Sequence, residues 1–170
     1  LHILFPAVVA ITLFLFVIFG IVIPSFEENL LNRKREMIRE LTNSAWSILS
    51  ECNRAAEQGL LSETEARNTA ISQVRALRYG PEAKDYFWIT DMYPRMVMHP
   101  YRPELVGRDL TDYTDREDKS GKKLFVEFVE LVKTGSEGYL EYQWQWMDDS
   151  SRAEPELSYV RGVPAWGWVV

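Results

Sequence analysis

The chain opens with a nearly continuous run of hydrophobic residues. From Ile3 to Ile23, only Pro6, Thr12 and Gly20 interrupt it. A helix needs roughly 20 apolar residues to cross a bilayer core that is about 30 Å thick. A cleavable signal peptide is the competing interpretation, but its apolar region is usually about 7–15 residues long and ends in a small-residue cleavage site, which this run lacks. We therefore predict a transmembrane helix over residues 1–25.

A helical period follows the apolar run. From Phe26 to about Glu57, hydrophobic residues recur three and four positions apart, with charged residues between them and no Gly or Pro before Gly59. This pattern predicts one long amphipathic helix that continues from the membrane span. The apolar spacing between Leu30 and Leu41 approaches a heptad, although Lys34 lies within it, and favours pairing with a second copy of the chain. Packing of the helix on its own domain is the alternative.

Two shorter helices are expected further along the chain. Ser62 and Glu65 form a capping-box pair at the start of the first. The second has Asp118 or Ser120 as its cap and Gly135 at its end. The residues expected to face the core recur at helical spacing, namely Ala66, Ala70, Ile71, Val74 and Leu77 in the first helix and Leu124, Phe125, Phe128, Val129 and Val132 in the second.

Two short segments in the middle of the chain predict a β-hairpin. They are Asp85–Thr90 and Arg95–His99, and the residues between them supply turn chemistry. Side chains alternate between the two faces of a strand. Tyr86 and Trp88 therefore share one face, and Phe87 lies on the other. Because both faces carry large rings, we expect this hairpin to be covered on both sides.

The last third of the chain predicts three more strands. From Gly138 to Trp146 hydrophobic residues alternate strictly with polar ones. We expect a polar loop from Met147 to Pro155, followed by strands at Leu157–Arg161 and Trp166–Val170. Neighbouring strands in this order can pair antiparallel, with helices before and among them. The predicted fold class is α+β.

Composition and charge exclude several kinds of function. The chain has 170 residues and a formal net charge of −6, which argues against a nucleic-acid partner. A lone cysteine, Cys52, and two histidines, His2 and His99, leave no intrachain disulfide and predict no metal centre and no cofactor. The carboxylates between Asp112 and Asp118 lack the order of an EF-hand calcium loop. Ser158 with His99 is the one nucleophile and base combination, but no nucleophile-elbow glycines surround the serine, so we expect no enzyme.

Short motifs then recur in a fixed order along the chain. They are YFWITDMYPRMVMHP at Tyr86–Pro100, PELVGRDL at Pro103–Leu110, GKKLF at Gly121–Phe125, GSEG at Gly135–Gly138, YQW at Tyr142–Trp144, LSYV at Leu157–Val160 and WGWVV at Trp166–Val170. In this order they resemble the single Cache domain family, in the branch called Cache type 2. Members of that family are extracytoplasmic sensor domains of bacterial chemoreceptors and sensor histidine kinases.

The resemblance implies an architecture and a location. The sheet would be PAS-like and antiparallel, with five to six strands and a long N-terminal helix, and residues 26–170 would be one sensor domain. The strand begun at Trp166 would continue past Val170 into a second membrane span and a cytoplasmic output module. The receptor would lie in the bacterial inner membrane with its sensor domain in the periplasm.

The resemblance also implies a small-molecule pocket. Ligands of similar domains are mostly short organic acids such as acetate, propionate and pyruvate. A small carboxylate needs a few hydrogen-bond donors within an apolar enclosure. The residues expected to line the pocket are Trp88, His99, Tyr142, Trp144, Tyr159 and Arg161. Glu156 departs from the family, because similar sequences often carry a lysine there, which puts a simple acid in doubt. A ligand-free structural or protein-interaction module is the alternative function.

Overall fold

The computed structural model describes residues 4–114, 121–146 and 149–170. The chain divides into two compact units, residues 1–37 and 38–170, and each is described by itself.

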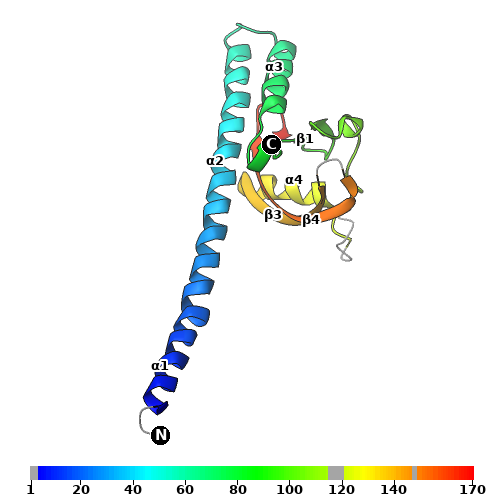
Figure 1. Cartoon of the computed structure of the whole chain (residues 1–170). Coiled ribbons are helices and arrows are strands. Elements are labelled where there is room, and N and C mark those ends of the chain that lie inside the picture. Colours follow the sequence, from blue (N-terminus) through cyan, green and yellow to red (C-terminus); the bar gives the residue numbers. More distant parts are fainter. Residues whose placement is uncertain (1–3, 115–120, 147–148) are drawn as a thin grey trace. The chain divides into compact units, whose positions relative to one another are not determined.

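Helices make up the described part of the first unit. α1 (Leu4–Val17) leads through a π-helical turn, η1 (Ile18–Val22), into α2 (Ile23–Glu57), whose first part belongs to this unit (Figure 1). The large apolar side chains of this unit are exposed, among them Phe14 and Phe16 of α1. Among the described residues, the helix that contains them is the one long and apolar enough to cross a membrane.

An antiparallel sheet forms the centre of the second unit. In the part of the chain that is described, it has five strands in the order β2-β1-β5-β4-β3. The strands are β1 (Ile89–Asp91), β2 (Met96–Met98), β3 (Glu137–Trp146), β4 (Asp149–Val163) and β5 (Trp168–Val169). Figure 1 shows β3 and β4 as a long, curved hairpin. The predicted α+β class, with a long N-terminal helix and a five-stranded antiparallel sheet, is confirmed.

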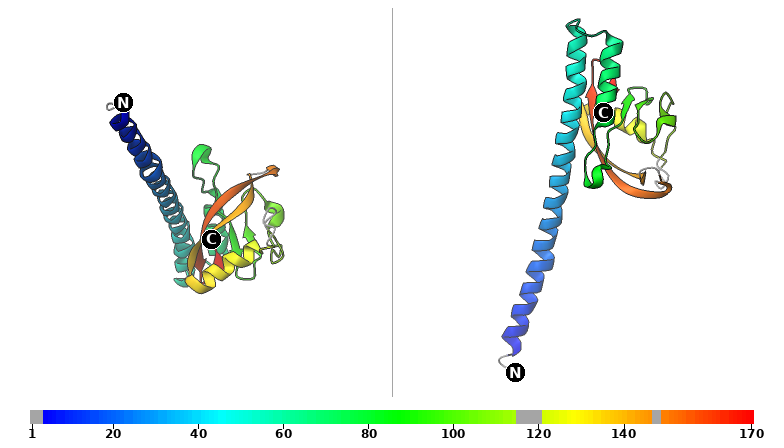
Figure 2. Two further views of the ribbon diagram at one scale, coloured as in Figure 1. Left: turned by 90° about the horizontal axis from the view of Figure 1, so that it is seen from below. Right: turned by 45° about the horizontal axis from the view of Figure 1, so that its top comes forward.

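Helices cover the sheet on both faces. On one face, Leu49 of α2 and Ala70 of α3 (Glu63–Ala76) lie in one hydrophobic cluster with Ile89. On the other face, Phe128 of α4 (Leu124–Gly135) clusters with Trp144. Figure 2 shows α3 alongside α2, and α4 beside the curved hairpin. The prediction that the first hairpin is covered on both sides is therefore confirmed.

The helix ends follow local hydrogen-bonding chemistry. Ser62 and Glu65 form the predicted capping box: the Ser62 hydroxyl accepts from the Glu65 amide, and the Glu65 carboxylate accepts from the Ser62 amide. The predicted caps of α4, Asp118 and Ser120, lie outside the described residues. α4 begins at Leu124, after Lys123 as its N-cap. α4 ends at Gly135, as predicted, and the residue after it, Ser136, is a left-handed C-cap with a φ of 68°.

Two strand predictions were wrong in extent. We predicted a loop over residues 147–155, but β4 begins at Asp149. These polar residues form a strand because they pair with β3, and the last pair of that ladder is Asp149 with Trp146. Pairing with a neighbouring strand overrides a low intrinsic β-propensity. The first strand begins at Ile89 and not at Asp85, which makes an isolated bridge with Tyr79.

The last strand is also shorter than predicted. It covers Trp168–Val169, because Trp166 and Gly167 belong to the preceding turn. The Trp166 amide donates to the Val163 carbonyl at 3.1 Å, and Gly167 has a φ of 64°, a left-handed conformation that suits glycine.

Candidate functional site

Aromatic side chains gather on the face of the sheet that α4 covers. We define the aromatic site by its five members, which are Tyr86, Trp88, His99, Tyr142 and Trp144. In the β1–β2 register, Ile89 is opposite Met98, and both side chains point to the face covered by α2 and α3. Trp88 precedes Ile89 and His99 follows Met98, so by alternation their side chains share the face that α4 covers. Tyr142 and Trp144 share the same face of β3 by alternation, and both belong to the cluster around α4.

Ring contacts connect the members of the aromatic site. The Tyr86 ring lies 4.9 Å from the His99 ring, and the Trp144 ring stacks 6.3 Å from His99. The Trp144 indole donates from Nε1 to the Tyr86 hydroxyl at 3.2 Å. Trp88 packs on Phe128 of α4, with 4.9 Å between the ring centroids. Hydrogen-bond donors and aromatic rings from segments far apart in the sequence thus lie close together in the aromatic site.

His99 is held in one protonation state. It is 2% exposed, and its Nδ1 accepts hydrogen bonds from the backbone amides of Tyr101 at 3.2 Å and Arg102 at 3.0 Å. Burial, and then the positive charge of Arg102, lower the pKa of His99 to about 4. At neutral pH the ring is therefore uncharged and carries its proton on Nε2.

The Nε2 atom of His99 has no hydrogen-bond partner among the described residues, although it is buried. Buried polar groups are almost always paired, so an unpaired donor is unusual. In a site enclosed by aromatic rings, an N–H without a partner is the feature expected where a ligand binds.

The tyrosine hydroxyls of the site stay protonated. Burial, and then the negative charge of Glu156, raise the pKa of Tyr142 and that of Tyr86 above the ordinary value. The Tyr142 hydroxyl shares a hydrogen bond of 2.8 Å with the hydroxyl of Ser158 on β4. Both phenols can therefore donate to an anion or accept from a cation.

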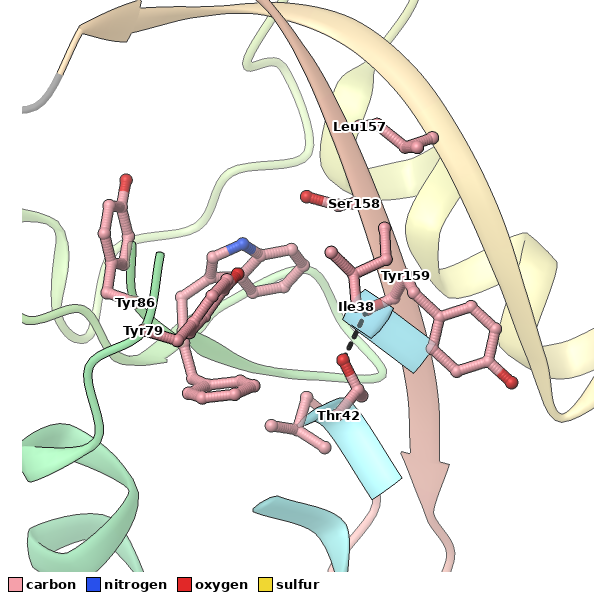
Figure 3. Close-up of a pocket in the computed structure, with 10 residues that line it drawn as sticks. Ile38, Thr42, Tyr79, Tyr86, Leu157, Ser158 and Tyr159 are labelled. Atoms are coloured by element: carbon pink, nitrogen blue, oxygen red, sulfur yellow. Dashed lines mark hydrogen bonds between the residues drawn. The ribbon is translucent and has the colours of Figure 1, made fainter. Parts of the chain in front are cut away.

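A small cavity lies beside the aromatic site. Figure 3 shows Tyr79 and Tyr86 on one side of it, Leu157 and Ser158 of β4 on the other, and Ile38 of α2. Its volume is about 30 Å³. Since one water molecule needs about 10–15 Å³ on this measure, the cavity has room for one or two waters, and a metabolite requires the rings to move apart.

A second cavity, of about 220 Å³, lies away from the aromatic site and contains none of its residues. It is lined by Met92, Val132, Ser136, Gly162, Val163, Pro164, Gly167 and Trp168. Ser136 supplies its one side-chain hydroxyl, so this cavity offers little to orient a polar ligand.

Two of the six predicted site residues, Tyr159 and Arg161, have side chains on the other face of the sheet, although Tyr159 is among the residues that line the small cavity. Tyr159 is opposite Tyr139 in the β3–β4 register, and Figure 3 shows its ring on the far side of β4 from Tyr86. Burial, and then Glu137, raise the pKa of Tyr159 to about 12. Thr42 donates to the Tyr159 carbonyl at 3.4 Å, which ties this part of β4 to α2.

Arg161 also faces α2 and not the aromatic site. Its guanidinium lies 3.9 Å from the centroid of the Trp46 ring and donates to Asn43 Oδ1 at 2.8 Å. Its Nε lies 3.6 Å from a carboxylate oxygen of Glu137. The structure thus brings together Trp88, His99, Tyr142 and Trp144, while Tyr159 and Arg161 join β4 to α2.

Sequence reasoning missed two members of the site neighbourhood. Tyr86 belongs to the site and shares a face with Trp88 in the alternation pattern, so the pattern alone contained the signal. Ser158 requires the β3–β4 register, which pairs it with Leu140 and puts it on the face of Tyr142. No pattern within a single strand specifies that register.

We expect the stability of the protein to depend on pH through His99. In the unfolded chain its pKa is about 6.5, so between that value and about 4 the unfolded state binds more protons than the folded state. The contribution of the neutral His99 ring to the free energy of unfolding is complete above pH 6.5 and is lost as the pH falls toward 4. Between pH 7 and pH 5 the loss should be about 2 kcal/mol.

Urea unfolding at several pH values measures this effect. The variant His99→Gln should lose less stability than the wild type over the same interval, and the titration of the carboxylates is common to both proteins. Equal slopes in the two proteins would contradict the buried neutral histidine.

Comparison with known proteins places the chain among sensor domains. A family model described as Cache domain (dCache_2) matches residues 21–170. The methyl-accepting chemotaxis protein McpP of Pseudomonas putida is 33% identical over 142 residues, which cover 84% of this chain and 25% of McpP. The sensor histidine kinase MctS of Rhizobium johnstonii is 30% identical over 149 residues, which cover 87% of this chain and 30% of MctS.

A solved structure gives the same result for the fold. It is described as the structural basis for carboxylic acid recognition by a Cache chemosensory domain. It is 32% identical, with a TM-score of 0.76, and the match covers 84% of this chain and 92% of that chain. The chain therefore spans most of an isolated sensor domain, but less than a third of the length of McpP or MctS.

Proposed function

We propose a ligand for this chain on the premise that it belongs to the Cache domain family, the extracytoplasmic sensor domains of chemoreceptors and sensor histidine kinases. The ligand is a small metabolite with a carboxylate group, of the size of acetate, propionate or pyruvate. The observation that carries this proposal is the buried Nε2 donor of His99, which has no partner among the described residues.

The chemistry of the aromatic site supports a carboxylate. His99 Nε2, the Trp144 indole and the hydroxyls of Tyr86 and Tyr142 are all N–H or O–H groups within a ring-lined enclosure. Small-ligand sites combine mostly apolar walls with a few polar groups that fix orientation. The solved neighbour that recognises a carboxylic acid is consistent with this reading. We assign Trp88, His99, Tyr142 and Trp144 to the ligand site.

A calorimetric titration tests the proposed ligand class. We expect the chain in detergent micelles to bind at least one of the C2–C4 carboxylates, and His99→Gln to weaken that binding by at least tenfold. Tyr159→Phe is the matched control, because its hydroxyl lies on the other face of the sheet, and it should bind like the wild type. Absence of binding by any carboxylate would instead favour a ligand-free structural module.

Contacts between β4 and α2 support a signalling step that passes through the long helix. Tyr159 and Arg161 join β4 to α2, while Ser158 and Glu156 on the same strand face the site. A ligand that moves β4 would therefore change the contact with α2. The helix runs without a break from Val8 to Glu57, so the same helix contains the predicted membrane span. The ligand can shift the two signalling states only by its difference in affinity for them.

We also propose an arrangement for the whole receptor, of which this chain is one part. Residues 1–25 would anchor it in the bacterial inner membrane, and residues 26–170 would form one sensor domain on the periplasmic side. An output module of the chemoreceptor or kinase type would respond in the cytoplasm. The membership of the family and the apolar helix support this arrangement.

We further propose that α2 pairs with α2 of a second copy of the chain. The pairing surface is the heptad-like seam between Leu30 and Leu41, and Leu30 at its start is exposed. Leu30→Cys in a Cys52→Ser background should form a disulfide-linked dimer under mild oxidation, at a rate that changes with ligand. Asn32→Cys, on another side of the helix, is the control. Equal rates at the two positions would contradict a specific seam.

A further inference from the structure

The cavity of about 220 Å³ lies where the end of α4 and the β1–β2 turn meet the link between β4 and β5. Val132 and Ser136 line it from the end of α4, Met92 from the β1–β2 turn, and Pro164 and Gly167 from the link. A Cβ atom added to Gly167 would meet no atom within 4 Å outside its chain neighbours, and the left-handed φ of 64° favours glycine at this position. One wall of the cavity therefore has no side chain to fill the space in front of it.

Backbone hydrogen bonds fix the walls of the cavity. The Gly162 amide donates to the Ser136 carbonyl at 2.9 Å, and the Met92 amide donates to the Gly167 carbonyl at 3.0 Å. α4 also touches β4 directly, because a Cβ atom added to Gly162 would come within 2.6 Å of Val132 Cγ1. The walls cannot close on one another without breaking these contacts. Since protein interiors are close-packed, a hollow of this size that is held open is a candidate binding site.

The lining of the cavity selects against charge. Among the described residues that line it, the side chains are apolar or aromatic apart from the Ser136 hydroxyl. A charged ligand would lose its hydration here without gaining an ionic partner, which is costly. A water molecule needs about two to four polar partners, and the amides of Gly162 and Met92 are already bonded. The cavity is therefore suited to an uncharged, largely apolar molecule.

The volume of the cavity and the side chain of Met92 favour an aromatic ring. An engineered apolar cavity of about 150 Å³ binds benzene, so this larger cavity has room for a ring with a short substituent. The methionine thioether makes favourable contacts with aromatic rings and adapts its shape to them. Ser136 and Pro164 are exposed, so the single hydroxyl lies on the solvent side of the cavity. A ring that carries a hydroxyl group toward solvent complements this arrangement.

One wall of the cavity is joined to α2. The carbonyl of Gly162 accepts a hydrogen bond of 2.8 Å from Trp46 Nε1 of α2, and the Arg161 guanidinium lies over the Trp46 ring. Gly162 thus contacts the end of α4 through its amide and α2 through its carbonyl. A molecule bound beside Gly162 lies next to the residue that connects these two helices.

We propose that this cavity is a second binding site of the domain, for an uncharged molecule with one aromatic ring and a hydroxyl group, of the kind of phenol or benzyl alcohol. The ring lies between Met92 and Val132, and the hydroxyl group pairs with the hydroxyl of Ser136. The bound ring contacts the wall that connects α4 to α2, which gives this ligand a route to α2 outside the aromatic site. The lining of the cavity includes no member of the aromatic site, so the proposal is independent of the carboxylate ligand.

Methionine methyl resonances report on this site directly. In the full chain in detergent micelles, labelled with ¹³C at the methionine methyl groups, benzyl alcohol should shift the Met92 signal saturably, because an aromatic ring moves nearby resonances. Met92→Leu identifies that signal. Met96 and Met98 are buried and do not line the cavity, so their signals should stay in place. Benzoate and benzylamine, which carry a charge on a similar ring compound, should bind at least tenfold more weakly at equal free concentration.

Variants at two lining residues test where the ring and the hydroxyl group bind. Val132→Phe places a second ring in the cavity and should weaken binding of benzyl alcohol by at least tenfold. Thr134→Phe, at an exposed position of the same helix, is the matched control and should bind like the wild type. Ser136→Gly removes the hydroxyl in a backbone conformation that suits glycine, so the fold is retained. It should weaken benzyl alcohol about three- to tenfold and leave the binding of benzene unchanged.

Several outcomes would overturn the second site. One is the absence of a saturable Met92 shift with every ring compound, and another is a charged probe that binds as tightly as benzyl alcohol. A shift of Met98, which precedes His99, in place of Met92 would mean that the ring binds near the aromatic site instead. Unchanged affinity in both Val132→Phe and Ser136→Gly would also count against the cavity. None of these outcomes affects the carboxylate proposed for the aromatic site.

Discussion

Replacing Phe128 with alanine should lower the free energy of unfolding of the sensor domain by about 3–5 kcal/mol, the usual cost of deleting a buried phenylalanine ring. Phe128 is 1% exposed and lies in the middle of α4. Its ring contacts Trp88 at 4.9 Å and Tyr142 at 5.4 Å between centroids. The loss is large because several rigid rings surround the cavity and cannot collapse into it together.

Denaturant unfolding of a fragment comprising residues 27–170 measures this loss. Leu60→Ala is the control, because Leu60 is 72% exposed in the turn after α2, and its cost should stay within about 0.5 kcal/mol. Since domains are stable by only about 5–15 kcal/mol, Phe128→Ala should bring this one close to its unfolding limit. A loss below about 1 kcal/mol would mean that α4 does not hold the aromatic site together.

The same ring joins the fold to the site. Trp88 and Tyr142 are both assigned to the ligand site, and both contact Phe128. The milder variant Phe128→Leu fills most of the space and should keep the protein folded. It should nevertheless weaken ligand binding, because the ring against which Trp88 and Tyr142 pack is gone.

Local sequence patterns predicted the fold well wherever one element carries its own signal. The Ser62–Glu65 capping box and the alternation of Leu140, Tyr142 and Trp144 are both present as predicted. The start of β4 was wrong because its first residues are polar and become a strand only through the ladder with β3. Those residues pair with β3 through the hairpin, Glu154 with Trp144 and Ala153 with Gln145, and the pattern within one strand does not contain that pairing.

The site was predictable in composition but not in geometry. Trp88, His99, Tyr142 and Trp144 were expected together and lie together. Arg161 was expected to line the pocket, yet it faces Trp46 and Asn43, because the β3–β4 register puts it on the face of Tyr159. A one-residue change of register would have reversed that assignment.

Removal of the apolar N-terminal segment should have the largest effect of all, because it should move the protein from the membrane fraction to the soluble fraction. The side chains of Phe14, Phe16 and Phe19 are 64%, 67% and 65% exposed, and the helix around them carries no charge as far as Pro24. Burying one such side chain is worth about 1.5–3 kcal/mol, so many of them together favour the bilayer strongly. The full chain should therefore sediment with membranes and resist extraction by salt, while residues 27–170 should stay in the soluble fraction.

Two arginines in the same segment provide the sharper test of that anchor. Leu13→Arg with Phe16→Arg should abolish membrane insertion, because each arginine near the centre of a spanning helix costs about 2.5–3.5 kcal/mol. Leu13→Ala with Phe16→Ala is the matched control and should remain in the membrane. Mass spectrometry of the extracted protein separates an anchor from a signal peptide. A product that starts after residue 25 would show cleavage and would contradict a retained span, and with it a helical connection from α2 to the membrane.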